Sequence, residues 1–288
     1  LLALTLGTFG PEGRPFFQDI AQADSSAIIS IIIGGVIFNL SNICLSASTS
    51  IAGMSVAFPV GCGLALVLGV INNLRVEMSQ GALKSNLTLL AIGVALVVVA
   101  VILNGIASGK KAGNAEISKA DQRKGIILAV VAGVVMSFFS SFVMKAMDLK
   151  DFANMEPGKV GPYTAIVVFS LAVLASHFIF GPIFMKWPFQ GAPVKMSEYF
   201  KGNSKTHLVG MLGGCIWCLG TALSYIAAGK AGASVSYALG QGAPMVAAIW
   251  GVFVWKEFKG SNKTVYGLLG AMFCFFLVGL GMIVAAGM

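Results

Sequence analysis

The chain has 288 residues, of which 57% are hydrophobic and only 10% are charged, and its mean hydropathy is +0.88. A soluble domain carries roughly 25% charged residues, so this composition excludes a water-soluble protein and indicates an integral membrane protein. The net charge of +8 then concerns orientation in the membrane and does not indicate nucleic-acid binding.

Eight apolar stretches are long enough to cross a bilayer, which takes roughly 20 mostly apolar residues. Before them, the opening LLALTLG is too short to span, and we interpret it as the tail of another span. Barrel strands would alternate over about 10 residues, so the sequence predicts an all-α bundle. The eight stretches are 26–47, 52–74, 86–107, 125–147, 162–185, 207–228, 232–255 and 264–287.

An internal repeat joins the two halves of the chain. GGVIFNLSNICLSASTSIAGMSVAFPVGCGLALV, from Gly34, aligns without gaps with GGCIWCLGTALSYIAAGKAGASVSYALGQGAPMV, from Gly213, at an offset of 179 positions. The offset predicts a unit of five helices, and an odd unit inverts the second copy, as is typical of secondary transporters. We therefore expect a first repeat at 1–107 that lacks its first helix and most of its second, a hydrophilic central loop at 108–124, and a second, inverted repeat at 125–288.

Helix-breaking residues recur at equivalent places in both copies. Paired interruptions of this kind are the best sequence indication of a transporter binding site. The alternative is that they are packing kinks and close-contact glycines. The expected hinge positions are Pro59, Gly61 and Gly63 in the first copy, and Gly240, Gly242 and Pro244 in the second.

Polar residues occur in the spans that precede the two spans with helix-breaking residues. Asn39 and Asn42 share a face of the span 26–47, and Thr221 and Ser224 share a face of 207–228. Such groups are costly in lipid without partners, so we expect them to point into the bundle. There they either bind a solute or only hydrogen-bond between helices. The expected solute-binding residues are Asn39, Asn42, Phe58, Trp217, Thr221, Ser224, Tyr237 and Gln241.

Charged residues lie at the ends of the spans or in the loops and not at the centre of any span, which favours a neutral polar solute. His177 is the one ionisable group well inside a span, and it is a candidate for proton coupling or, alternatively, a packing hydrogen bond. Cys215 and Cys218 form a CxxC without a second pair or nearby His, so no metal site is expected. NGIASGKK, around Gly105, lacks the phosphate-loop spacing. No cofactor, catalytic residue or enzyme activity is expected.

The basic residues indicate an orientation. Twelve of the 19 Lys and Arg residues lie in the segments 110–124, 186–205 and 256–263, which share one side of the membrane. Basic loops stay in the cytoplasm, so we expect a multi-pass protein of the cell (inner or plasma) membrane with a cytoplasmic central loop and the C-terminus outside. The oligomeric state stays open.

A family resemblance agrees with these features. LTLGTFGPEGRPFFQDIAQADSS, IAGMSVAFPVGCGLALVLGVINN and APMVAAIWGVFVWKEFKGSNKTVYGLLG together resemble the ureide permease family of the drug/metabolite transporter superfamily. More distantly, they resemble bacterial sugar transporters of the glucose-uptake and rhamnose-symport type. The resemblance implies ten helices in two inverted repeats and alternating-access uptake of small polar metabolites such as allantoin and nucleobases, usually with protons. A sugar carrier, a multidrug exporter and a non-transporting scaffold are the alternatives.

Overall fold

The computed structural model describes residues 2–9, 13–112 and 118–288, without the side chains of 54–56, 58 and 112. Within the described residues the chain is helical and has no named strand, so the predicted all-α bundle is confirmed. Among the described residues, eight helical segments are long and apolar enough to cross a membrane, as the sequence predicts. They are α3 (Ser25–Ala52), α4 (Met54–Gln80), α5 (Leu87–Ala112), α6 (Lys119–Ala146), α7 (Pro162–Lys186), α9 (Ser204–Ala231), the pair α10 (Ala233–Gly240) and α11 (Ala243–Ile249) with a π-helical turn (Trp250–Val254), and α12 (Lys263–Ala286). Short helices are α1 (Leu6–Phe9), α2 (Phe16–Gln22) and α8 (Ser197–Phe200).

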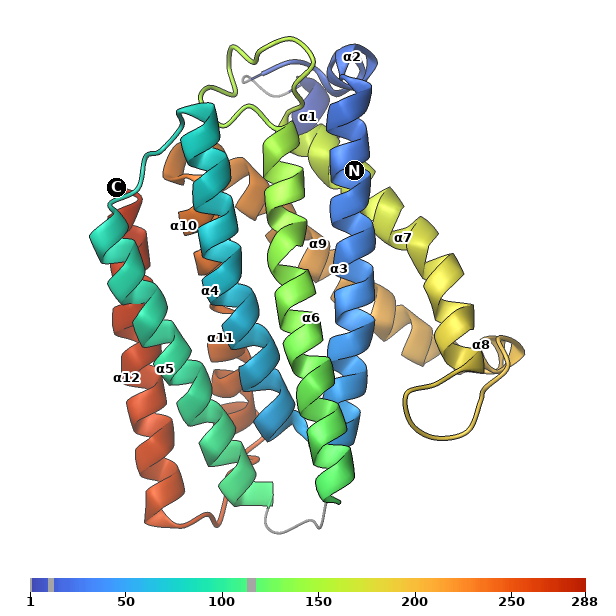
Figure 1. Cartoon of the computed structure of the whole chain (residues 1–288), viewed down its shortest axis with the longest axis vertical. Helices are drawn as coiled ribbons and strands as arrows, with labels where there is room; N and C mark the ends of the chain where they lie inside the picture. The colour runs from blue at the N-terminus through green and yellow to red at the C-terminus, as the bar shows by residue number, and fades with distance from the viewer. Residues whose placement is uncertain (1, 10–12, 113–117) are drawn as a thin grey trace.

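The spans cross the bundle alternately (Figure 1). One end holds the α5–α6 connection, and we call it the central-loop face. The other end holds the chain segment before α3, the loop 147–161 and the C-terminus, and we call it the opposite face. Helices α5 and α6 extend into the hydrophilic segment 108–124, and Ser118 caps α6 by accepting a hydrogen bond from the Asp121 amide at 3.1 Å.

Helix α6 lies between α3 and α4, α5 packs along α12, and α10 packs against α4 and α9 (Figure 1). Small residues allow these close approaches. A Cβ added at Gly133 of α6 would lie 2.5 Å from the Gly61 carbonyl oxygen of α4. Gly61, an expected hinge, therefore serves helix packing here.

Two glycine turns have almost the same backbone conformation. Gly53, between α3 and α4, has φ 80° and ψ 150°, and Gly232, between α9 and α10, has φ 89° and ψ 153°. Side-chain-bearing residues rarely adopt this region. The two glycines are separated by the same 179 positions as the sequence repeat.

The helix breaks differ between the two copies. In the second, α10 ends at Gly240, the chain turns at Gln241 and Gly242, and α11 begins at Ala243. The expected break in the first copy is wrong, because α4 runs from Met54 to Gln80 with Pro59 inside it. Proline has no backbone N–H, but Pro59 lies near the start of α4. The long part of the helix after Pro59 therefore keeps its hydrogen bonds. Pro244 lies in mid-span, and it fits the first turn of the new helix that follows the break.

Candidate functional site

Aromatic side chains from five helices meet inside the bundle. The ring of Phe38 (α3) lies 4.8 Å from that of Trp217 (α9) and 5.0 Å from that of Phe139 (α6), measured between centroids. Phe139 in turn lies 6.0 Å from Tyr237 (α10), and Phe169 (α7) lies 5.5 Å from Phe38. The predicted stacking residues Trp217 and Tyr237 thus belong to one group of rings, which we call the aromatic cluster.

The members of the aromatic cluster differ in accessibility. Trp217 is 42% exposed, whereas Tyr237 is 5% exposed. The Tyr237 hydroxyl donates to the Ala65 carbonyl of α4 at 2.9 Å, and its ring occupies the space beside Gly69. Tyr237 therefore anchors α10 to α4, and Trp217 keeps a larger part of its ring surface exposed.

The predicted polar residues fall into two groups. In the first, the hydrogen bonds cross between helices. Asn39 Nδ2 donates to Ser176 Oγ of α7 at 2.9 Å, and the Ser224 and Ser236 hydroxyls of α9 and α10 lie 2.9 Å apart. Asn39 and Ser224 thus hold the bundle together.

In the second group, the side chains bond only within their own helix or have no hydrogen bond to a described residue. Asn42 Nδ2 bonds the Phe38 carbonyl at 3.2 Å, and Thr221 Oγ1 bonds the Trp217 carbonyl at 3.0 Å, each within its own helix. The half-buried side chain of Gln241, at the α10–α11 turn, has no hydrogen bond to another described residue. These three side chains remain able to turn toward a solute.

One expectation is changed by the structure, and another cannot be compared with it. His177, the proton-coupling candidate, lies on the exposed face of α7, while its neighbour Ser176 faces the bundle. The structure therefore does not bring His177 to the aromatic cluster, because one residue along a helix turns the side chain by roughly 100°. Phe58 has its side chain outside the described part of the chain.

Glu77 of α4 is a buried acid, although the sequence predicts it at the end of a helix. It is 0% exposed, and its Oε1 accepts hydrogen bonds from the Ser234 amide at 2.7 Å and the Ser234 hydroxyl at 2.9 Å. Ser234 lies at the N-terminus of α10, where free amides and the helix dipole stabilise a carboxylate. A Cβ at Gly232 would lie 2.8 Å from Oε1, so a larger residue there would crowd the carboxylate. Glu77 ties α4 to α10 across 157 residues of sequence.

Asn72 and Asn73 of α4 also make contacts that were not predicted from the sequence. Asn72 Nδ2 donates to the Ser137 carbonyl of α6 at 3.2 Å, and Asn73 Oδ1 accepts from the Ser140 hydroxyl at 3.2 Å. Two adjacent amides at the end of an apolar run were the available signal, since each needs a partner in lipid.

The opposite face is closed over this end of α4. Gln80 Nε2 of α4 donates to the Met147 carbonyl at 3.1 Å, and Lys84 Nζ donates to the Leu149 carbonyl at 3.1 Å. The loop 147–161 that carries these carbonyls lies above the end of α9, where the Phe152 ring contacts the backbone at Gly229. The loop therefore bridges the two helices that flank α10.

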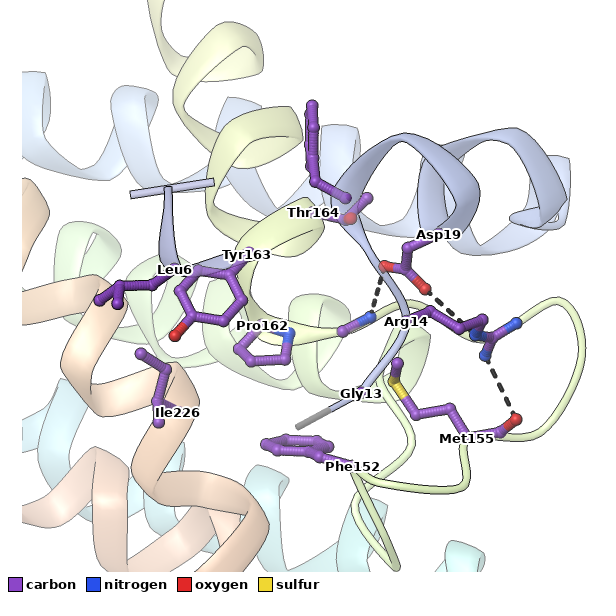
Figure 2. Close-up of a pocket in the computed structure, with 12 residues that line it drawn as sticks. Leu6, Gly13, Arg14, Asp19, Phe152, Met155, Pro162, Tyr163, Thr164 and Ile226 are labelled. Carbon is purple, nitrogen blue, oxygen red and sulfur yellow. Dashed lines mark hydrogen bonds and ion pairs between the residues drawn. The ribbon is translucent and has the colours of Figure 1, made fainter. Parts of the chain in front are cut away.

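The segment before α3 fastens this loop from outside (Figure 2). Arg14 Nη2 donates to the carbonyls of Met155 at 3.3 Å and Glu156 at 2.9 Å, and Arg14 Nε lies 3.6 Å from Asp19 Oδ1. Asp19 is 2% exposed and accepts the Gly161 amide at 2.8 Å. A cavity of about 240 Å³ lies beneath the loop, so this closure does not fill all the space below it.

The central-loop face is different. A cavity of about 510 Å³ lies there between the start of α4, the end of α5 and α11. Pro59 and Pro244, the expected hinge prolines of the two copies, both line it. The other lining residues are Asn104, Gly105, Ser108, Lys111, Ala243, Ala247, Ala248, Gly251, Trp255, Glu257 and Phe258.

No group of three His, Cys, Asp or Glu within the described part of the chain is placed to hold a metal ion. The five cysteines are free, and Cys215 is exposed. The arrangement therefore offers stacking surfaces, amides and hydroxyls, and these groups are suited to binding a polar solute.

Comparison with known proteins decides the family. Residues 114–286, more than half of the chain, match the protein-family profile described as ureide permease. The chain belongs to the ureide permease family. It is therefore a membrane transporter and not an enzyme.

Curated relatives from Arabidopsis thaliana agree with this assignment to the ureide permease family. Ureide permease 1 is 23% identical over 336 residues, covering 99% of this chain and 85% of the relative. Ureide permease 2 is 22% identical over 347 residues with the same coverage, and Ureide permease 4 is 25% identical over 163 residues, covering 56% of this chain and 40% of the relative. No solved structure matches the chain significantly.

Proposed function

We propose that this chain is a secondary active transporter that moves a small neutral polar metabolite, of the ureide or nucleobase type, by alternating access and with a proton. The observation that carries the proposal is the pairing of α4 with α10–α11. The pair is hydrogen-bonded at the opposite face through Glu77 and Ser234, and residues of α4 and α11 line a cavity together with α5 at the central-loop face. Such a difference between the two ends is what alternating access requires of one conformational state.

The aromatic cluster supports a planar, uncharged solute. Trp217 offers an accessible ring face, and Asn42, Thr221 and Gln241 offer donors and acceptors without charge. Aromatic stacking with a few amide hydrogen bonds suits a flat heterocycle. The printed names of the relatives, ureide permeases, point to the same class.

The two inverted repeats, 1–107 and 125–288, remain part of the proposal, as does their place in a ten-helix fold of the drug/metabolite transporter type. The glycine turns support them, since Gly53 and Gly232 share one conformation, and Gly81 and Gly260, also 179 positions apart, both have positive φ. In this proposal, rocking of the repeats loosens the Glu77 contact and bends the chain at Gly240–Gly242. The Lys and Arg bias makes the central-loop face cytoplasmic.

Transport into proteoliposomes tests the proposal. Radiolabelled allantoin, uracil, rhamnose and glucose are offered with and without an inward proton gradient. Gradient-driven accumulation of allantoin or uracil is the expected result. Accumulation of a sugar would instead identify the chain as a carrier of the sugar-uptake type. No flux of any of the four solutes would refute the proposed uptake, and a drug-resistance assay would then test export.

A further inference from the structure

The cavity at the central-loop face has walls of two kinds. On one side α11 and the π-helical turn present only small residues, Ala243, Ala247, Ala248 and Gly251, apart from Pro244. On the other side α5 presents polar residues. The small side chains of α11 leave space opposite α5, and Trp255, Glu257 and Phe258 line the same cavity.

The polar wall is a stripe along one face of α5. Asn104, Ser108 and Lys111 follow the spacing i, i+4, i+7, which places them above one another. Within the described part of the chain, the side chains of Asn104 and Ser108 have no hydrogen-bond partner. An amide without a partner in a membrane span is costly. We therefore expect Asn104 and Ser108 to hydrogen-bond a molecule that enters the cavity.

The mouth of the cavity carries both signs of charge. Lys111 and Glu257 line it, and they form no ion pair with each other. The Lys111 ammonium instead donates to the Lys259 carbonyl at 3.3 Å. Because the mouth carries charges of both signs, it gives little net attraction to a charged solute. The Asn104 amide can pair with a solute that carries a carbonyl oxygen beside an N–H group.

We propose that this cavity is a second solute-binding site, separate from the aromatic cluster, which takes a small neutral amide- or ureide-type solute through Asn104 and Ser108. The inference rests on the proposed function for the class of solute. The cavity volume of about 510 Å³ falls in the range of small-molecule sites, roughly 300–1,000 Å³. The aromatic cluster is built by α3, α6, α7, α9 and α10, whereas the cavity is built by α4, α5 and α11, so the two sites share no residue.

Equilibrium binding of radiolabelled allantoin and uracil to the purified chain in lipid nanodiscs tests the inference. The wild-type chain is expected to bind two molecules of the solute, with two affinities. Asn104→Ala should weaken one class by about three- to tenfold, the worth of one hydrogen bond, and leave the other unchanged. Ala247→Phe should fill the cavity and abolish that class. Ile106→Ala, on the exposed face of α5, is the matched control and should change neither class.

The other outcomes are distinct. A single class of sites that neither Asn104→Ala nor Ala247→Phe alters would overturn the second site and indicate that water or a lipid chain fills the cavity. Uptake into proteoliposomes would still stand in that case. Absence of both binding and uptake would overturn this inference and the proposed function together. Should Ala247→Phe fail to fold, Asn104→Ala alone decides, since it only shortens a half-buried side chain.

Discussion

The two ends of the α4 and α10–α11 pair are built in opposite ways. At the opposite face the polar groups at the end of α4 and just after it are used, because Glu77, Gln80 and Lys84 all bond to α10, α9 or the loop 147–161. At the central-loop face, Asn104 and Ser108 of the neighbouring α5 have no described partner, and α11 offers alanines. One end is thus joined by specific bonds, and the other is left as space.

The difference between the two ends indicates which end is harder to open in the proposed transport cycle. A hydrogen bond contributes about 0.5–1.5 kcal/mol, and Glu77 accepts two from Ser234. The cavity end has no comparable bond to break. In the proposed transport cycle, opening the Glu77 end is therefore the step that costs most free energy, and we expect binding of the solute or of a proton to compensate for it.

The largest effect is expected at Glu77. Glu77→Leu removes the acceptor and leaves the Ser234 amide and hydroxyl unpaired in a buried place, at about 1–3 kcal/mol for each lost partner. We expect gradient-driven accumulation to be lost because the opposite face no longer seals. Accumulation ratios in proteoliposomes and the thermal midpoint measure this.

Ser234→Ala is the matched control for Glu77→Leu. It removes only the hydroxyl and keeps the amide bond to Oε1, so its effect should be about 1 kcal/mol. Accumulation by Glu77→Leu at the wild-type level would show that the Glu77 end is not a gate.

Trp217 lies between the two ends and should show the next largest effect. Trp217→Ala removes the accessible stacking surface, and stacking of a heterocycle on an aromatic side chain is worth about 1–3 kcal/mol. We expect the KM for uptake to rise at least about fivefold. Trp250→Ala, which removes an exposed tryptophan of the π-helical turn, should leave the KM unchanged. Equal effects of the two substitutions would place the solute outside the aromatic cluster.

Substitutions of Pro59 and Pro244 test the part that the central-loop face plays in transport. Pro244→Ala lets α10 and α11 join more easily, since it restores a backbone N–H and relieves the proline clash. We expect the maximal uptake rate to fall severalfold with little change in KM. Pro59→Ala acts on a helix that is already continuous, so its rate should stay near that of the wild type. A larger loss in Pro59→Ala than in Pro244→Ala would mean that the bend in α10–α11 takes no part in transport.

Much of this architecture could be predicted from the sequence. The spans follow from the lengths of the apolar runs, which the bilayer thickness sets. The interruption at Gly240–Gly242 follows from three helix-breaking residues in mid-span. The continuity of α4 could not be predicted, because it depends on the distance from Pro59 to the Gly53 turn and on the packing of Gly61 against α6.

The candidate site was less predictable than the fold. Hydropathy places Glu77 at the end of a span, but α4 continues to Gln80 and brings the carboxylate to Ser234, a contact between distant segments that no local pattern contains. Asn39 and Ser224 were found as polar residues, yet only the structure shows that they bond to other helices. Composition identifies polar groups in a membrane, and tertiary packing decides which of them stay free.

The smallest effect is expected at His177, which lies apart from both ends. His177→Gln changes a side chain on the exposed face of α7, and surface substitutions change stability by less than about 0.5 kcal/mol. We expect the dependence of uptake on the proton gradient to be unchanged, and uptake measured at several external pH values checks this. Glu77→Gln, which keeps the size of the side chain and removes its charge, is the contrasting variant and should flatten the same pH profile. Loss of proton dependence in His177→Gln with an intact profile in Glu77→Gln would identify His177, and not Glu77, as the proton-coupling group. The difference between the two ends would then govern access of the solute alone.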